Sequence, residues 1–224
     1  MTTALTTARP DTWEMVFAHN SFRRHFGAIP GLIRAVPEGD VERAATVVGF
    51  LEELTRALHH HHEAEDELMW PLLLERAPMD TAMILRMEEQ HERIGELYQR
   101  AAGLAADFAS AAEVKRGAEL AGTVTDLVAV LDEHLHDEEV EILPLVERVL
   151  TVSEWEAVGE RARTAIPKNR QLIFLGFLLA ANPPELNRTF LAHLPLAARA
   201  AWKLLGRRAF VKEYWRVYGA DPAR

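Results

Sequence analysis

The sequence contains no cysteine and no long apolar run, and these absences exclude several classes of protein. Without cysteine there can be no disulfide framework, thiolate metal site or cysteine nucleophile, and a reducing compartment is expected. The first residues lack a basic segment followed by an apolar one, so no secretory signal is expected. The longest strongly apolar run, Leu172 to Ala181, is too short to cross a bilayer. We therefore expect a cytoplasmic protein with no membrane partner.

The chain also lacks an excess of positive charge. Its formal net charge is −9, which argues against a nucleic-acid partner. The charge is unevenly spread. Residues 182–224 carry eight Lys and Arg against three acidic residues, a net charge of +5, which leaves −14 for the rest of the chain. A basic tail on an acidic body is typical of self-association or of a solvated face. A homodimer formed through the C-terminal helices is one expectation.

Apolar residues recur at helical spacing throughout, and no convincing strand pattern is present. Helix starts are indicated by Asp40 and Asp80, which follow turn residues, and by three apparent capping boxes. These boxes pair Ser110 with Glu113, Ser153 with Glu156, and Asn182 with Glu185. The expected helices cover residues 12–36, 40–77, 80–109, 111–150, 153–165, 168–181, 184–193 and 196–218.

Four long amphipathic helices with short links predict an all-α protein, an up-down four-helix bundle over residues 12–150. Residues 151–224 are expected to form additional C-terminal helices packed on this bundle. The apolar side chains that predict this packing are Trp155, Phe174, Phe177, Leu178, Trp202 and Trp215.

An internal repeat carries the residues that point to chemistry. His61-x-x-x-Glu65 and His134-x-x-x-Glu138 are each followed by an acidic residue and then by Pro-Leu at the same offset, 73 residues apart. His19 and His91, on the other two long helices, are 72 residues apart. Residues i and i+4 share one helical face, so each pair can grip one metal ion or lie between two. Two helix pairs related by an approximate two-fold would bring both sets together.

The candidate ligands lie on apolar helix faces, which predicts that they are buried. Burying a carboxylate costs several kcal/mol unless it is paired or bound to a metal, and no Lys or Arg lies on these faces near Glu65 or Glu138. Imidazole and carboxylate ligands suit iron, manganese or zinc rather than copper(I). The predicted site therefore holds two metal ions, with His19, His61, His91 and His134 as terminal ligands and the two glutamates able to bridge.

His62 lies about 100° around the helix from His61, at the edge of the apolar face. It can be a seventh metal ligand or a donor that hydrogen-bonds a ligand, and both roles stay open. His59 and His60 are expected to face solvent, and His25, His136 and His193 receive no role. The acids that follow the two glutamates, Asp66 and Glu139, are expected to be solvated acids, with a hydrogen bond to a ligand histidine as the alternative. Pro71 and Pro144 are expected to kink or end their helices.

A ferritin-like di-iron centre is the main structural alternative, because it also lies in a four-helix bundle. That centre requires Glu-x-x-His on two helices. Only Glu88-x-x-His91 fits this pattern, and no second copy occurs. The sequence therefore argues against it.

Together, His19, His61-x-x-x-Glu65, His91 and His134-x-x-x-Glu138 resemble the hemerythrin-like, or HHE cation-binding, family, over about residues 12–150. The resemblance implies two non-haem iron ions bridged by carboxylate and oxo groups, in preference to manganese or zinc, and a diatomic or peroxide ligand. The chain departs from the oxygen-carrying hemerythrins of marine worms, which have His-x-x-x-His on the third helix and His-x-x-x-x-Asp on the fourth. Here Gly95 follows His91 at i+4, and Glu138 is the acid. These departures argue against reversible oxygen carriage.

Two functions remain as hypotheses. In the first, a di-iron centre binds dioxygen, peroxide or nitric oxide, with or without turnover. In the second, the protein is a non-catalytic iron or oxygen sensor whose metal state is read out through the C-terminal helices, which carry Arg199, Lys203, Arg207 and Arg208 at helical spacing.

Overall fold

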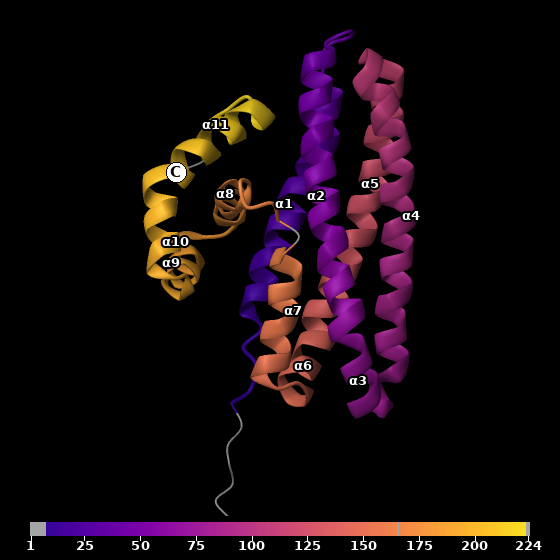
Figure 1. Cartoon of the computed structure of the whole chain (residues 1–224). Helices are drawn as coiled ribbons and strands as arrows, with labels where there is room; N and C mark the ends of the chain where they lie inside the picture. Colours follow the sequence, from indigo (N-terminus) through magenta and orange to yellow (C-terminus); the bar gives the residue numbers. More distant parts are fainter. Residues whose placement is uncertain (1–7, 165, 223–224) are drawn as a thin grey trace, which may run out of the picture.

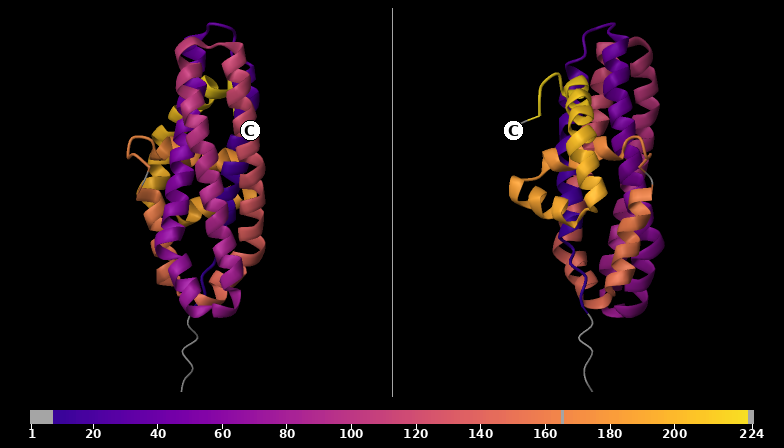
Figure 2. Two further views of the ribbon diagram at one scale, coloured as in Figure 1. Left: turned by 90° about the vertical axis from the view of Figure 1, so that its right-hand side faces the viewer. Right: turned by 60° about the vertical axis from the view of Figure 1, so that its left-hand side comes forward.

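The computed structural model describes residues 8–164 and 166–222, and four long helices dominate it (Figures 1 and 2). These are α1 (Trp13–Arg34), α2 (Val41–Leu68), α4 (Thr81–Ala111) and α5 (Val114–Asp137). Each of α1 and α4 packs against both α2 and α5, so the four form an antiparallel bundle. The described residues contain no strand, which confirms the all-α prediction. None of the described helices is both long enough and apolar enough to span a membrane.

Two of the expected long helices are interrupted near a proline. Helix α2 ends at Leu68, and the short α3 (Trp70–Arg76) begins one residue before Pro71. Helix α5 continues through a π-helical turn, η2 (Glu138–Ile142), into α6 (Leu143–Val149), which contains Pro144. Because proline lacks an N–H group, it removes one backbone hydrogen bond of the preceding turn. The expectation that both prolines disturb their helices is confirmed.

The helix starts follow the capping signals only in part. The Asp40 carboxylate accepts a hydrogen bond from the Arg43 amide at 3.0 Å and caps α2 as predicted, whereas the Asp80 side chain makes no capping bond. Asp80 is the last residue of the 3-10 turn η1 (Pro78–Asp80), which leads directly into α4.

All three predicted capping boxes are wrong. Ser110 lies inside α4 and donates to the Asp107 carbonyl. The box at the start of α7 (Val152–Thr164) pairs Thr151 with Glu154, two residues before the predicted pair. The Asn182 amide donates instead to the backbone carbonyls of Phe17 and Leu178. Short polar side chains near a helix end have several backbone partners within reach, and the tertiary contacts choose among them.

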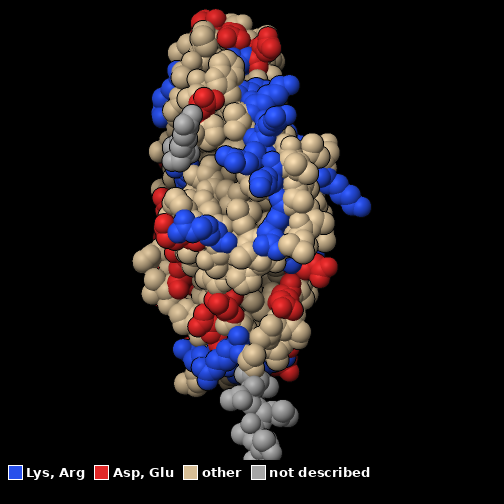
Figure 3. All heavy atoms as spheres, turned by 90° about the vertical axis from the view of Figure 1, so that its left-hand side faces the viewer, with Lys and Arg blue, Asp and Glu red and all other residues tan. Residues whose placement is uncertain are grey.

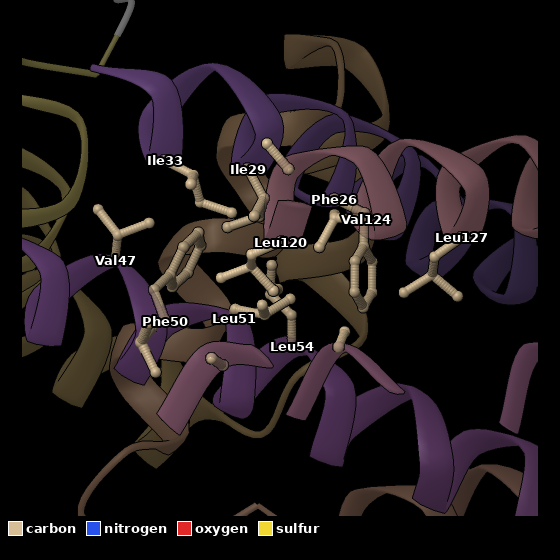
Figure 4. Close-up of a cluster of buried hydrophobic side chains, with 14 of the residues drawn as sticks. Phe26, Ile29, Ile33, Val47, Phe50, Leu51, Leu54, Leu120, Val124 and Leu127 are labelled. Carbon is tan, nitrogen blue, oxygen red and sulfur yellow. The ribbon is translucent and has the colours of Figure 1, made fainter. Parts of the chain in front are cut away.

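Buried apolar side chains form two clusters, one toward each end of the bundle. The larger is drawn in Figure 4, where Phe26 and Ile29 of α1 meet Leu51 and Leu54 of α2 and Val124 of α5. The smaller lies at the opposite end, around α3 and α6. Polar residues of the four long helices lie between the two clusters.

The C-terminal helices pack on the outside of the bundle (Figures 1 and 2). Helix α7 lies along α2, and α8 (Gln171–Ala181) packs against both α1 and the last helix. The remainder is α9 (Pro184–His193), α10 (Leu196–Ala201), the π-helical η3 (Trp202–Gly206) and α11 (Arg207–Tyr218). This confirms that the tail packs on the bundle. The separate domain boundary at residue 150 stays a prediction.

One apolar residue of the tail does not pack as expected. Phe177 is buried, but Trp215 is 59% exposed. Helix α11 turns Phe210, Tyr214 and Val217 inward. Successive helical residues are rotated by about 100°, so Trp215 points away from the face that carries Tyr214. The prediction that Trp215 packs on the bundle was wrong.

Candidate metal centre

Seven buried side chains from the four long helices and η2 meet between the two apolar clusters. They form two groups, and within each group one ligand atom of every member lies within 4.8 Å of the others. One group contains His19, His61 and Glu138, and the other contains His62, Glu65, His91 and His134. The structure therefore brings together all seven residues that the sequence predicts as the site.

The imidazoles of each group converge through their Nε2 atoms. The Nε2 atoms of His19 and His61 are 3.3 Å apart, as are those of His91 and His134. The ring of His62 stacks on His91, with centroids 3.9 Å apart and planes inclined by 11°. His62 of α2 thus belongs with His91 of α4 and His134 of α5, and the three imidazoles form one group.

Each buried glutamate reaches both groups. The two oxygens of Glu65 lie 3.2 Å from His61 Nε2 and 3.4 Å from His91 Nε2. Glu138 Oε2 lies 3.3 Å from His19 Nε2 and 3.8 Å from His134 Nε2. This is the placement that a carboxylate bridging two metal ions requires.

Several atoms of the site that could ligate a metal have no hydrogen-bond partner among the described residues. They are both carboxylate oxygens of Glu65, both of Glu138, and Nε2 of His62. Buried polar atoms are nearly always hydrogen-bonded, since leaving one unpaired costs roughly 1–3 kcal/mol and more for a charged group. Five unpaired atoms around one point fit a site built for cations. Imidazole nitrogens and carboxylate oxygens are also suitable ligands for iron.

Burial keeps most of these imidazoles neutral. It lowers the pKa of His61 and of His134 to about 3, and it lowers the pKa of His62 well below the ordinary value. Burial also disfavours the charged form of His19, but the adjacent Glu138 and Glu139 carboxylates outweigh it and raise the pKa of His19. A neutral imidazole has a free lone pair, which is the form that binds a metal.

The two carboxyl groups have opposite tendencies. Burial, together with the negative charge of Glu138, raises the pKa of Glu65 well above its ordinary value. Burial disfavours the charge on Glu138 as well, but the positive charge of the nearby His19 overcomes it and lowers the pKa of Glu138 to about 2. Two nearby buried carboxylates resist ionising together unless positive charge lies between them.

The acids that follow the two glutamates hold the histidines from outside. Glu139 Oε1 accepts a hydrogen bond from His19 Nδ1 at 2.9 Å, and Asp66 Oδ1 accepts one from His91 Nδ1 at 2.8 Å. With the proton on Nδ1, the lone pair of Nε2 faces the centre. The expectation that Asp66 and Glu139 are merely solvated was wrong, and the alternative of a hydrogen bond to a ligand histidine is confirmed.

Two partners escaped sequence analysis. Gln90 Oε1 lies 3.2 Å from His134 Nδ1, and the Gln90 amide donates to Asp137 at 3.0 Å. Arg23 donates to Glu139 at 2.6 Å. Asp66 and Glu139 stood at the same place in both repeats, which was a usable signal, whereas nothing in the local sequence marks Gln90 or Arg23.

At the π-helical turn η2, two consecutive acids contact one histidine, as Glu65 and Asp66 do with His91 from the regular helix α2. The wider turn of η2 begins at Glu138. Glu138 points to Nε2 of His19, and Glu139 reaches Nδ1 of the same ring. A π-turn inside an α-helix often marks a functional site, because it changes the direction of side chains within one turn.

The other histidines separate into surface and buried positions. His59 and His60 contact the Glu63 carboxylate at the surface, as expected. His136 and His193 are exposed. His25, to which the sequence assigned no role, is fully buried between α1 and the C-terminal helices.

Buried imidazoles and carboxylates on facing helices define a metal-binding helical bundle. A family model described as the hemerythrin HHE cation binding domain matches residues 12–146, more than half of the chain. The chain belongs to this family. Membership implies that it binds a metal cation, commonly iron, and the buried His/Glu cluster is compatible with that role. Neither the comparison with curated proteins nor that with solved structures gave a match.

Proposed function

We propose that the chain is a non-haem di-iron protein that binds, and reacts with, dioxygen, peroxide or nitric oxide. His19 and His61 would hold one iron ion. His62, His91 and His134 would hold the other, and Glu65 and Glu138 would bridge the two. The observation that carries this proposal is a set of five buried oxygen and nitrogen atoms around one point that have no hydrogen-bond partner among the described residues.

The surrounding residues support a reactive centre rather than a solvated one. The apolar clusters on both sides limit the access of bulk water to the ligands. Asp66, Gln90 and Glu139 orient His91, His134 and His19 through their Nδ1 atoms. Two iron ions, when bound, would supply electrons to a small oxidant. The side chains fix the geometry in which they do so.

The first experiment is anaerobic loading of the metal-free protein with iron(II), followed by metal analysis and optical spectra as air is admitted. We expect about two iron ions per chain and new visible absorption bands in air. Tight binding with no spectral change in air would contradict dioxygen reactivity and indicate a structural centre.

A matched pair of variants assigns the iron to this site. Glu65→Gln with Glu138→Gln removes both bridging charges, and we expect iron binding to be lost. Glu52→Gln with Glu119→Gln removes two exposed acids from α2 and from α5, the helix that leads into η2, and should bind iron as the wild type does. Equal iron content in the two variants would overturn the ligand assignment.

Reaction is distinguished from binding by following peroxide. The iron-loaded protein is expected to consume hydrogen peroxide faster than free iron, and Glu65→Ala is expected to abolish the difference. Parallel measurements follow the loss of nitric oxide. If neither small molecule nor dioxygen is consumed above the rate of free iron, only binding remains.

A sensor role is the second candidate, and one contact favours it. His25 lies on α1, the helix of His19, and its Nε2 donates to the Phe177 carbonyl of α8 at 3.0 Å. Because a carbonyl only accepts, His25 Nδ1 accepts from the Tyr218 hydroxyl at 2.6 Å. A shift of α1 on metal binding would therefore reach α8 and α11 directly. Limited proteolysis of the tail should then differ between metal-free and iron-loaded protein, and identical cleavage would contradict this role.

A further inference from the structure

The outer face of the last helices carries exposed apolar and basic side chains together. Leu204, Leu205 and Trp215 are 71%, 68% and 59% exposed. Residues three or four positions apart on an α-helix are neighbours, so within α11 Lys212 lies near both Arg208 and Trp215. We name Lys203, Leu204, Leu205, Arg207, Arg208, Val211, Lys212 and Trp215 the outer face. The opposite side of α11 is buried against α8 and the bundle.

The positive charges of the outer face are not neutralised by ion pairs in the described part of the chain. Lys203, Arg207, Arg208 and Lys212 form no ion pair with any residue between 8 and 164 or between 166 and 222, whereas Arg188 and Arg216 each pair with a glutamate. Figure 3 views the side on which the C-terminal helices lie and shows Lys and Arg side chains gathered along this region beside uncharged surface. A surface of this charge favours a negatively charged partner.

An open hollow lies within the outer face. Its volume is about 500 Å³, and it is lined by Arg207, Arg208, Val211, Lys212, Trp215 and Asp221. Three cations and one carboxylate leave the lining positive. The hollow is large enough for an anionic headgroup, with the Trp215 indole beside it.

A second copy of the chain does not fit this face. A two-fold interface places the same patch against itself. Four unpaired cations would then face four others, and like charges in contact are unfavourable. The homodimer expected from the sequence is therefore not assigned to the outer face.

An anionic lipid surface fits better than a protein partner. The centre of a protein interface is depleted of lysine, whereas here Lys203 and Lys212 stand beside exposed apolar side chains. A membrane interface accepts both kinds together, because tryptophan and leucine lie at headgroup level while Lys and Arg meet lipid phosphates. We propose that the protein binds anionic membranes peripherally through the outer face of η3 and α11. This departs from the absence of a membrane partner expected from the sequence.

The experiment is co-sedimentation of the full-length, iron-loaded protein with two kinds of vesicle. One contains equal parts of phosphatidylglycerol and phosphatidylcholine, and the other contains phosphatidylcholine alone. We expect binding only to the first, weakened by salt because screening shortens the reach of the charges. No binding to phosphatidylglycerol vesicles at low ionic strength would overturn the proposal.

Charge variants test the position of the contact. Arg207→Glu, Arg208→Glu and Lys212→Glu together are expected to weaken binding at least about tenfold. The control combines Arg34→Glu, Arg100→Glu and Lys115→Glu, three exposed cations of the bundle with no ion pair among the described residues, and changes the net charge equally. It should bind nearly as the wild type does. Equal loss in both variants would show only bulk charge and overturn the assignment to the outer face.

Apolar variants test insertion at unchanged charge. Leu204→Ser with Trp215→Ser should weaken binding, and the emission of Trp215, taken as the difference between wild type and Trp215→Phe, should shift to the blue on vesicles. Unchanged binding and emission would overturn the insertion of these side chains. Sedimentation of the vesicle-free protein completes the test, because a wild-type dimer that Trp215→Ser dissociates would assign the outer face to a second copy.

Discussion

At the scale of single residues, the centre combines fixed imidazoles with carboxylates that have no hydrogen-bond partner among the described residues. Asp66, Gln90 and Glu139 hold three of the rings by Nδ1, so their Nε2 atoms are directed inward. Such outer hydrogen bonds typically change metal affinity 10–100-fold when removed. His62 differs, because its Nε2 is buried and unpaired and its ring is held by stacking on His91.

His62→Ala tests whether this imidazole is a ligand. We expect the affinity for the second iron ion to fall at least about tenfold, since one of three imidazoles on that side is lost. Titration with iron(II) under anaerobic conditions, with metal analysis after dialysis, measures the change. His59→Ala, at the surface three residues away, is the control. An unchanged affinity would show that His62 serves packing alone.

His25 makes the stability of the protein depend on pH. Burial lowers its pKa to about 4, the hydrogen bond to the Phe177 carbonyl opposes this, and the charge of Arg24 adds to it. The other titratable group facing the ring is the Tyr218 hydroxyl, whose pKa is raised above 10. In the unfolded chain an imidazole titrates near 6.5. The unfolded state therefore binds a proton first as the pH falls, and stability that is fully present above pH 6.5 is lost progressively down to about pH 4.

Comparison with His25→Gln isolates this contribution, because the other histidines titrate equally in both proteins. The difference in free energy of unfolding between the metal-free proteins should shrink by up to ~3 kcal/mol between pH 6.5 and pH 4. Urea unfolding at a series of pH values measures it. A difference that stays constant with pH would rule out a buried neutral His25.

At the scale of elements, α8 and α11 approach each other closely at one glycine. A Cβ atom at Gly176 would lie 2.2 Å from Cγ of Phe210 and 2.6 Å from its Cβ. These atoms are near the backbone of α11 and cannot swing away as the end of a long side chain can. The absence of a side chain at Gly176 therefore sets the distance between the two helices.

Gly176→Ala should loosen the C-terminal helices from α8 without emptying the metal centre. We expect a destabilisation of about 1–3 kcal/mol, as for other overpacked sites, and faster tryptic cleavage near Arg207, with the iron content unchanged. Gly122→Ala, in α5 where a Cβ meets nothing within 4 Å, should be neutral or slightly stabilising. Equal effects of the two substitutions would contradict a specific role of Gly176.

At the scale of the whole molecule, a layer of buried polar side chains divides the apolar core into two parts. Two buried carboxylates destabilise the fold when no cation compensates them. The ions that the site binds are therefore expected to contribute to the stability of the entire bundle, since the site joins all four long helices.

Metal removal should lower the melting temperature. A ligand at 100 times its dissociation constant adds about 2.7 kcal/mol, which corresponds to roughly 5–10 °C for a chain of this size. Calorimetry of metal-free and iron-loaded protein measures the shift, and Glu65→Gln with Glu138→Gln should show none. Equal melting temperatures of the two wild-type samples would mean that the centre is not needed for folding.

The sequence by itself predicted the all-α bundle and the seven residues that the structure brings together, with the role of His62 left open. These predictions follow from local spacing, because residues i and i+4 share a helical face. The repeat that contains His61 and His134 also indicates an approximate two-fold relation between the two helix pairs. Pro71 and Pro144 likewise predicted the irregularities in their helices, because proline lacks the backbone N–H group.

Only the tertiary structure decided the partners across helices. That Asp66 holds His91, that Gln90 meets His134 and that His25 joins α1 to α8 and α11 depends on how far one helix is shifted and rotated against the next. The exposure of Trp215 has the same cause, since an apolar residue is buried only where another element covers it. Spacing along one helix carries no record of those shifts and rotations, which packing against the neighbouring helices sets.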